Sequence, residues 1–281
     1  MSLLFQIECL DINYIDLSQR QSASRDLAQF ICKLTHLREL RLGDEYYSPS
    51  FHDEFYSTVS SLASCAKIER LDIKYIDLGQ RQSASRDLAQ FICKLPHLRE
   101  LCLGDELYST SFHDEFYSTL SSLASSAKIE ILYHNENLSE RPSASRDFAR
   151  LICKMNHLKN LTLDGYYHDD FYSTASSIAS TTKIETLDHN GHLSKRPSAS
   201  RDLAQFICKM NHLKNLTLYG QYHDVFYSTA SSMASTAKMV SGNRARSNGI
   251  KFLAVPAQSE VQSQLPFTHH QELQADEEQD I

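Results

Sequence analysis

The sequence predicts an α/β solenoid in which eight strand–helix units stack along one axis. Long units recur at a spacing of 55–61 residues, and each contains two shorter units. Every shorter unit has a phrase of the form apolar-x-x-Leu-x-apolar, which is typical of a strand with one buried face. Apolar residues between the phrases fall at helical spacing. Because a single unit of this length cannot bury its own apolar face, the units are expected to stack on one another.

The strand phrases set the number of units. Successive phrases begin 26–31 residues apart, at Ile7, Leu37, Ile68, Leu98, Ile129, Leu158, Ile184 and Leu213. Such short connections favour neighbour-to-neighbour stacking in chain order. Two phrases depart from the pattern, because His134 and His189 occupy their last apolar place.

Two kinds of helix alternate between the strands. Apolar residues recur at i, i+3, i+4 and i+7 over 27–34 in the first kind and over 55–66 in the second. Side-chain oxygens accept orphan N–H groups at helix starts. We therefore expect Ser22 or Ser24 to cap the first helix and Asp53 to cap the second.

Composition limits the class of protein. The 281 residues carry a net charge of −7 and are 41 % hydrophobic, enough for a packed core. The mild acidity argues against nucleic-acid binding, which needs a basic face. The sequence has no basic leader and no run of about 18 apolar residues, so we expect a cytoplasmic protein with no membrane span. We assign 1–239 to the solenoid and 240–281 to a divergent segment, mostly a disordered acidic tail.

Catalytic and metal motifs are missing. The chain has no P-loop, no His-Glu-x-x-His and no Gly-x-Ser-x-Gly. Four of the seven cysteines recur in Cys-x-x-x-His pairs, but zinc needs four ligands around one point, so we expect these cysteines to be small buried residues. These cysteines are Cys32, Cys93, Cys153 and Cys208. We expect no enzyme activity, no metal and no cofactor.

The repeated phrases resemble those of a known family. Ile-Glu-Arg-Leu-Asp-Ile from Ile68 matches the L-x-x-L-x-L core of the leucine-rich repeat. A period of about 28–31 residues with a full helix resembles the ribonuclease-inhibitor-type subclass, over residues 7–239. The Ile-Cys-Lys and Phe-Tyr-Ser-Thr phrases resemble repeat regions of NACHT-type (NOD-like) receptors of marine invertebrates. The resemblance implies a horseshoe with the parallel sheet on its concave face and helices on its convex face.

Charges alternate along the concave face. The second residues of successive phrases are Glu8, Arg38, Glu69, Arg99, Glu130, Lys159, Glu185 and Lys214. Adjacent strands lie about 4.8 Å apart, so we expect a self-paired ladder that fixes register; a charged recognition surface is the alternative. Residues that break the ladder are the better candidates for binding. They are Arg70, Lys74, Tyr133, Asn160, Asp188, Asn215 and Tyr219.

Tyrosines gather in the loops that follow every second strand. Insertions in a solenoid map to loops on one rim, which often binds ligands, and tyrosine is a favoured contact residue. The candidate rim residues are Tyr46, Tyr47, Tyr108, Tyr166, Tyr167 and Tyr222. In the alternative interpretation, one tyrosine per loop packs on the helix below.

These features favour a protein-interaction module with a protein ligand or signalling partner, monomeric as an isolated array. The receptor resemblance implies the sensing part of an innate immune receptor, or a fragment of one, acting in signal transduction. The alternative is a stand-alone inhibitor or substrate adaptor of the ribonuclease-inhibitor or ubiquitin-ligase-receptor type. A GTPase activator is disfavoured, because Arg41 and Arg70 occupy repeated strand positions.

Overall fold

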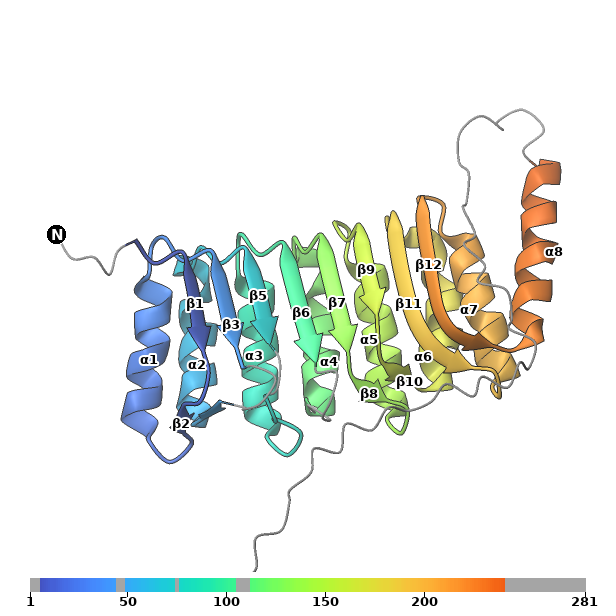
Figure 1. The fold of residues 1–281 in the computed structure, drawn as a ribbon. Coiled ribbons are helices and arrows are strands. Elements are labelled where there is room, and N and C mark those ends of the chain that lie inside the picture. Colours follow the sequence, from blue (N-terminus) through green and yellow to red (C-terminus); the bar gives the residue numbers. More distant parts are fainter. Residues whose placement is uncertain (1–5, 44–48, 74–75, 105–111, 241–281) are drawn as a thin grey trace, which may run out of the picture.

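The computed structural model describes residues 6–43, 49–73, 76–104 and 112–240. Within them, eight parallel strands form one sheet in chain order, and eight helices cover one of its faces (Figure 1). The predicted α/β stack of strand–helix units is confirmed. The sheet strands are β1 (Cys9–Ile12), β3 (Glu39–Leu42), β5 (Arg70–Ile73), β6 (Glu100–Gly104), β7 (Ile131–Asn135), β9 (Asn160–Leu163), β11 (Thr186–Leu193) and β12 (Asn215–Tyr222).

The helices alternate between two kinds, as their sequences predict. The first kind has 13 residues: α1 (Gln21–Lys33), α3 (Gln82–Lys94), α5 (Pro142–Lys154) and α7 (Pro197–Lys209). The second kind is α2 (Asp53–Leu62), α4 (Asp114–Leu123), α6 (Asp169–Ile178) and α8 (Asp224–Val240). A 3₁₀ turn extends three of these: η2 (Ala63–Cys65), η3 (Ala124–Ser126) and η4 (Ala179–Thr181). None of the helices in the described ranges is long and apolar enough to cross a membrane.

The core runs without a break from strand to strand. Leu40 lies opposite Leu71, which lies opposite Leu101, and all three are at most 1 % exposed. The same row of leucines continues through the later strands. Each unit therefore buries its apolar face against its neighbours, as stacking requires.

A buried serine joins each helix of the first kind to the segments around it. The Ser85 hydroxyl donates to the carbonyl oxygen of Leu78 at 3.1 Å and accepts from the backbone N–H of His113 at 3.1 Å. Ser24, Ser145 and Ser200 make the same two bonds. The expected capping role of Ser22 or Ser24 is wrong, because α1 begins after Arg20 without a side-chain cap.

Histidine caps the helices of the second kind. The His52 Nδ1 atom accepts from the backbone N–H of Glu54 at 3.2 Å, and Asp53 is the first helical residue. The prediction that Asp53 is the cap is therefore wrong by one position. Asp53 instead pairs with Arg81 on the next unit. His113, His168 and His223 cap their helices in the same way.

Short parallel pairings hold the loops beyond the strand ends. β2 (Asp16–Leu17) pairs with β4 (Ser50–Phe51), and β8 (Asn137–Leu138) pairs with β10 (Tyr166–Tyr167). At the corresponding place in the middle of the array, Leu78 and Phe112 form an isolated parallel bridge. These contacts bring the residue before each capping histidine into the core.

The recurring cysteines follow the expected burial in part. Cys32 and Cys153 are buried, whereas Cys93 and Cys208 are half-buried. Burial raises the pKa of the Cys32 thiol to about 11. A thiol with so high a pKa is a poor nucleophile, which fits a packing role.

Candidate binding surface

Side chains of β1, β3, β5 and β6 on the helix-free face of the sheet form a charged network, here called the charged half. Arg41 lies 2.8 Å from Glu39 and 3.6 Å from Asp11. Arg70 lies 3.2 Å from Glu39 and 3.1 Å from Glu100. The interpretation of Arg70 as a residue that breaks the ladder is therefore wrong, because it links two carboxylates on neighbouring strands.

A second row of charges lies one residue before the strands of the sheet, from β3 to β12. Glu130 lies 3.4 Å from Arg99 and 2.9 Å from Lys159, and the Lys159 hydrogen bond holds the pKa of Glu130 below its usual value. Arg38 pairs with Glu69, and Lys214 pairs with Glu185. The predicted self-paired ladder is confirmed at these strands. Exposed pairs add little to stability, so their main effect is on register.

The outward side chains of β7, β9, β11 and β12 form a different surface, here called the neutral half. Two rows in register cross these strands. The first row is Ile131, Asn160, Thr186 and Asn215, and the second is Tyr133, Thr162, Asp188 and Thr217. Of these eight residues, one, Asp188, carries a charge. In these two rows the helix-free face therefore changes from charged to largely uncharged along the array, while the charged ladder that precedes the strands continues to Lys214.

Most of the predicted strand candidates lie in the neutral half. Asn160 and Asn215 are exposed, and Tyr219 in the middle of β12 is 59 % exposed. Asp188 is half-buried between Thr162 and Thr217.

Tyr133 is less accessible than the other candidates of the neutral half. Its side chain is half-buried, and its hydroxyl donates to Asp164 at 3.2 Å. Lys74 lies outside the described residues. The structure thus brings five of the predicted residues onto one surface, namely Tyr133, Asn160, Asp188, Asn215 and Tyr219.

The tyrosines predicted for the rim differ in how exposed they are. Tyr166 is 56 % exposed, whereas Tyr167 and Tyr222 are buried and are not available for contact. Their assignment to the binding rim is wrong, because they precede the capping histidines and take the core positions held by Phe51 and Phe112 in earlier units. Tyr46, Tyr47 and Tyr108 lie outside the described residues.

The hydroxyl of Tyr222 is hydrogen-bonded to a buried histidine, His189, which accounts for a tyrosine at this core position. The Tyr222 hydroxyl donates to the carbonyl oxygen of His189 at 3.1 Å and lies 2.9 Å from its ring Nδ1. On the other side of the ring, Nε2 is 3.3 Å from the Tyr172 hydroxyl. Both ring nitrogens are thus satisfied, and burial lowers the pKa of His189 to about 4.

The equivalent cluster two units earlier contains a carboxyl group. His134 contacts Tyr167 at 2.9 Å and Tyr117 at 3.1 Å, and Tyr117 is also hydrogen-bonded to Glu136. Burial lowers the pKa of His134 to about 3 and raises that of Glu136 to about 8. The Tyr117 hydroxyl donates to one carboxyl oxygen of Glu136, so the carboxyl is tied to the tyrosine–histidine cluster while burial favours its neutral form.

Replacing Glu136 with glutamine should remove a loss of stability at alkaline pH. The folded carboxyl keeps its proton up to about pH 8, whereas the unfolded one loses it near its ordinary pKa of 4.5. The folded state therefore binds more protons in this window, and its stability falls as pH rises, by about 1.4 kcal/mol per pH unit.

Urea unfolding at pH 6.5 and pH 8 measures this effect. The buried histidines have folded pKa values far below the ordinary 6.5, so they raise stability somewhat over this range, equally in both proteins, and the difference between the two slopes reports Glu136. We expect a fall for the wild-type chain and a smaller fall, or none, for Glu136→Gln. Equal slopes for the two proteins would contradict a buried neutral carboxyl.

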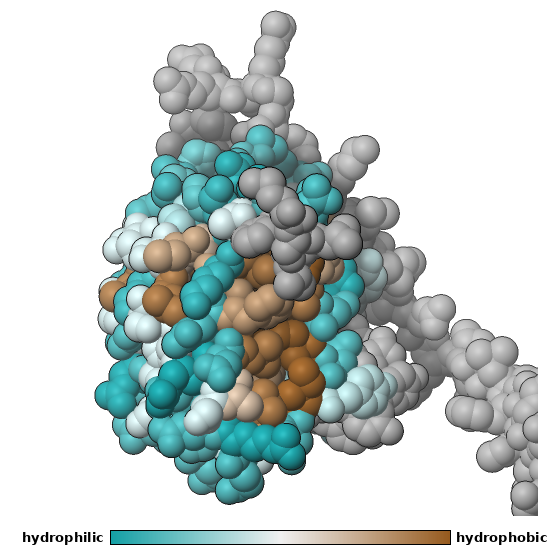
Figure 2. All heavy atoms as spheres, turned by 90° about the vertical axis from the view of Figure 1, so that its left-hand side faces the viewer, coloured by the Kyte–Doolittle hydropathy of each residue, from teal (hydrophilic) through white to brown (hydrophobic). Residues whose placement is uncertain are grey.

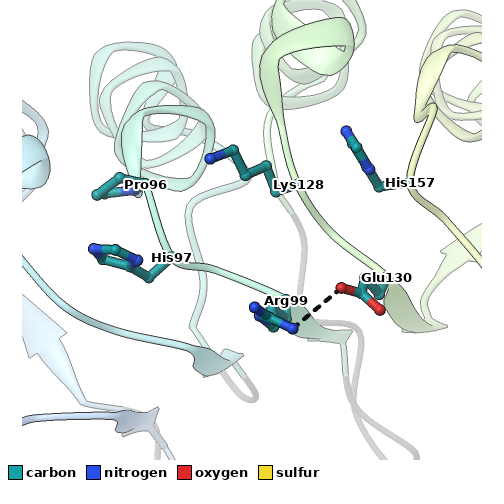
Figure 3. A pocket seen from close by; sticks show the side chains of 6 residues that line it. All are labelled: Pro96, His97, Arg99, Lys128, Glu130 and His157. Carbon is teal, nitrogen blue, oxygen red and sulfur yellow. Dashed lines mark hydrogen bonds and ion pairs between the residues drawn. The ribbon is translucent and has the colours of Figure 1, made fainter.

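A small basic pocket lies at the edge of the sheet where strands begin (Figure 3). Its volume is about 150 Å³, and Arg99 and Glu130 form an ion pair within it. The other lining residues are Pro96, His97, Lys128 and His157. Pockets for drug-sized ligands are larger and mostly apolar, so this small polar pocket does not suit such a ligand.

In the described part of the chain, no group of three or more His, Cys, Asp and Glu residues is placed to hold a metal ion. No protein-family model matches the chain, and no curated protein matches it.

Proposed function

We propose that the chain is a protein-recognition module that binds a protein ligand through the neutral half of its sheet. One observation carries the proposal: the charged half is paired within itself, whereas the neutral half presents exposed amides and tyrosine side chains. Tyrosine is enriched in protein interfaces, and charges are depleted from their centres. Asn160, Asn215 and Tyr219 are the residues expected to contact the ligand.

The backbone supports this role. The exposed residues stand on adjacent hydrogen-bonded strands, so a rigid sheet positions them rather than a mobile loop. Side chains held on rigid elements lose less conformational freedom on binding. A repeat array with these properties suits recognition better than reaction chemistry, which needs one special constellation of residues.

The finer proposal concerns the family. We propose a horseshoe-shaped leucine-rich-repeat array, with a cytoplasmic role in ligand sensing by a NACHT-type receptor. Its support is the resemblance of the strand phrases and of the two alternating kinds of unit. An eight-stranded parallel sheet with helices on one face is compatible with such an array. A stand-alone inhibitor or substrate adaptor would use the same surface.

Paired surface variants test the binding proposal. Asn160→Glu/Asn215→Glu adds two charges to the neutral half, and Arg41→Ala changes the charged half at a half-buried position. We expect protein ligands captured by the wild-type chain to bind the first variant at least about tenfold more weakly and the second unchanged. Circular dichroism checks that both variants fold. Equal binding by all three proteins would contradict the assignment of the neutral half.

The identity of the captured ligand separates the finer alternatives. A microbial or danger-associated protein favours the receptor, whereas a nuclease or a ubiquitin-ligase scaffold favours the inhibitor or adaptor.

A further inference from the structure

The first unit exposes an apolar face that later units bury. Helices α1 and α3 have the same 13-residue sequence, yet Phe30 is 37 % exposed and its counterpart Phe91 is 1 % exposed. Helix α2 covers this face of α3. Figure 2 shows the matching face of the first unit as an apolar patch at this end of the array. The partly buried residues of the patch are Ile7, Leu10, Ile15, Leu17 and Leu27.

The last described unit exposes the complementary face. Tyr227 on α8 is 51 % exposed, whereas its counterparts on α2, α4 and α6 are at most 1 % exposed. In those units the next helix of the first kind covers the tyrosine. Leu218 on β12 is likewise only partly buried, in contrast to Leu163 on β9 at 0 %.

The internal junctions show which contacts join these two faces. The Arg81 guanidinium lies 5.4 Å from the centre of the Tyr56 ring, pairs with Asp53, and donates to the carbonyl oxygen of Phe51 at 2.8 Å. Arg141 and Arg196 repeat the contacts to the aspartate and the tyrosine at the two later junctions. The same junction therefore forms three times within one chain.

The two ends carry the same residue types at the corresponding positions. Arg20, exposed before α1, corresponds to Arg81. Asp224 and Tyr227, exposed on α8, correspond to Asp53 and Tyr56. The ends of two copies thus match in apolar area, in charge and in the arginine–tyrosine contact, which is worth up to about 2 kcal/mol when desolvated.

We propose that the α8 face of one copy docks on the α1 face of a second copy, with Arg20 placed against Asp224 and Tyr227 of that copy. The contact is heterologous, so it leaves one free face at each end and can continue into longer chains of copies. This differs from the monomeric state expected from the sequence. It does not rest on the proposed ligand surface, which lies on the sheet and stays accessible in the assembly.

Sedimentation velocity of the full chain tests the proposal. From about 1 to 200 µM, a typical range for weak assembly, we expect a sedimentation coefficient that rises steadily with concentration. Arg20→Asp and Asp224→Arg should each weaken association at least about tenfold, because each places like charges opposite one another. Glu140→Lys, at the equivalent exposed turn before α5 in the middle of the array, is the matched control and should leave association unchanged.

Mixing the two charge variants gives the sharper test. Asp224→Arg chains present an arginine to the aspartate of Arg20→Asp chains, and the wild-type pair forms at the other junction. An equimolar mixture should therefore associate as well as the wild-type chain. A monomer throughout the concentration range, a complex that stops at two copies, or no recovery in the mixture would each overturn the proposal.

Discussion

Replacing Gly104 with alanine is expected to lower the free energy of unfolding by about 3 kcal/mol or more, the largest effect of any single methyl group considered. Gly104 has a φ of +89°, and a Cβ atom there would lie 1.9 Å from the carbonyl oxygen of Asn135. The left-handed backbone alone costs about 1–2 kcal/mol for other residues. The rest arises because β7, which carries Asn135, must move away from β6.

Gly79→Ser is the matched control for this prediction. Gly79 lies in the turn before α3, where the other units carry Ser18, Ser139 and Ser194. We expect a change within about 0.5 kcal/mol, as for most surface substitutions. Urea denaturation followed by circular dichroism compares both variants with the wild-type chain. A stability loss for Gly104→Ala no larger than for Gly79→Ser would contradict the close approach of β6 and β7.

Tyr222→Phe is expected to cost about 2 kcal/mol, because it removes the hydroxyl bonded to His189 and leaves a buried ring nitrogen unsatisfied. The double variant His189→Ile/Tyr222→Phe should recover much of this loss. It reproduces the apolar pairing of the first units, where Ile12 and Phe51 occupy the equivalent places and are both buried. A double-mutant cycle in urea gives the coupling between the two positions.

Phe51→Tyr provides the converse control. It adds a hydroxyl to a core position where the strand supplies Ile12 rather than a histidine, so we expect destabilisation by about 1–3 kcal/mol. The cluster would be contradicted if Tyr222→Phe and His189→Ile were simply additive, since independent residues show no coupling.

The array was predictable from sequence because its rules are local. The leucines of each strand phrase and the apolar spacing of each helix lie within about 30 residues, and repetition fixes their neighbours. The sign alternation at Arg99, Glu130 and Lys159 gave the ladder for the same reason, since parallel strands in chain order bring these residues together.

The buried polar clusters were not predictable in this way. His134 and His189 stand out as departures from the apolar pattern, but their partners are tyrosines 33 residues later in the next unit. The sequence did carry one signal for this pairing. In the units that follow His134 and His189, the residue before the capping histidine changes from phenylalanine to tyrosine. Glu136 gave no signal, because its burial depends on the packing of the segments around it rather than on its neighbours in sequence.

Arg70 shows a further limit of the sequence pattern. Its position in the strand alternates with Glu39 and Glu100 in register, a second ladder one residue beyond the first. The alternation of charge was followed at the second position of each phrase, so the ladder at the third position was not recognised from the sequence. The accessible surface could therefore be assigned only once the pairing of each outward side chain was known.

The buried serine of each unit has a consequence for how such a chain can change over generations. Ser24 and Ser85 each accept from a histidine 28 residues later, whereas Ser145 and Ser200 accept from one only 23 residues later. The same anchor thus tolerates a deletion of five residues in the intervening loop. Because the anchors and the junctions recur, unequal recombination can insert, delete or exchange whole units and keep these contacts, provided that each buried histidine stays next to its tyrosine.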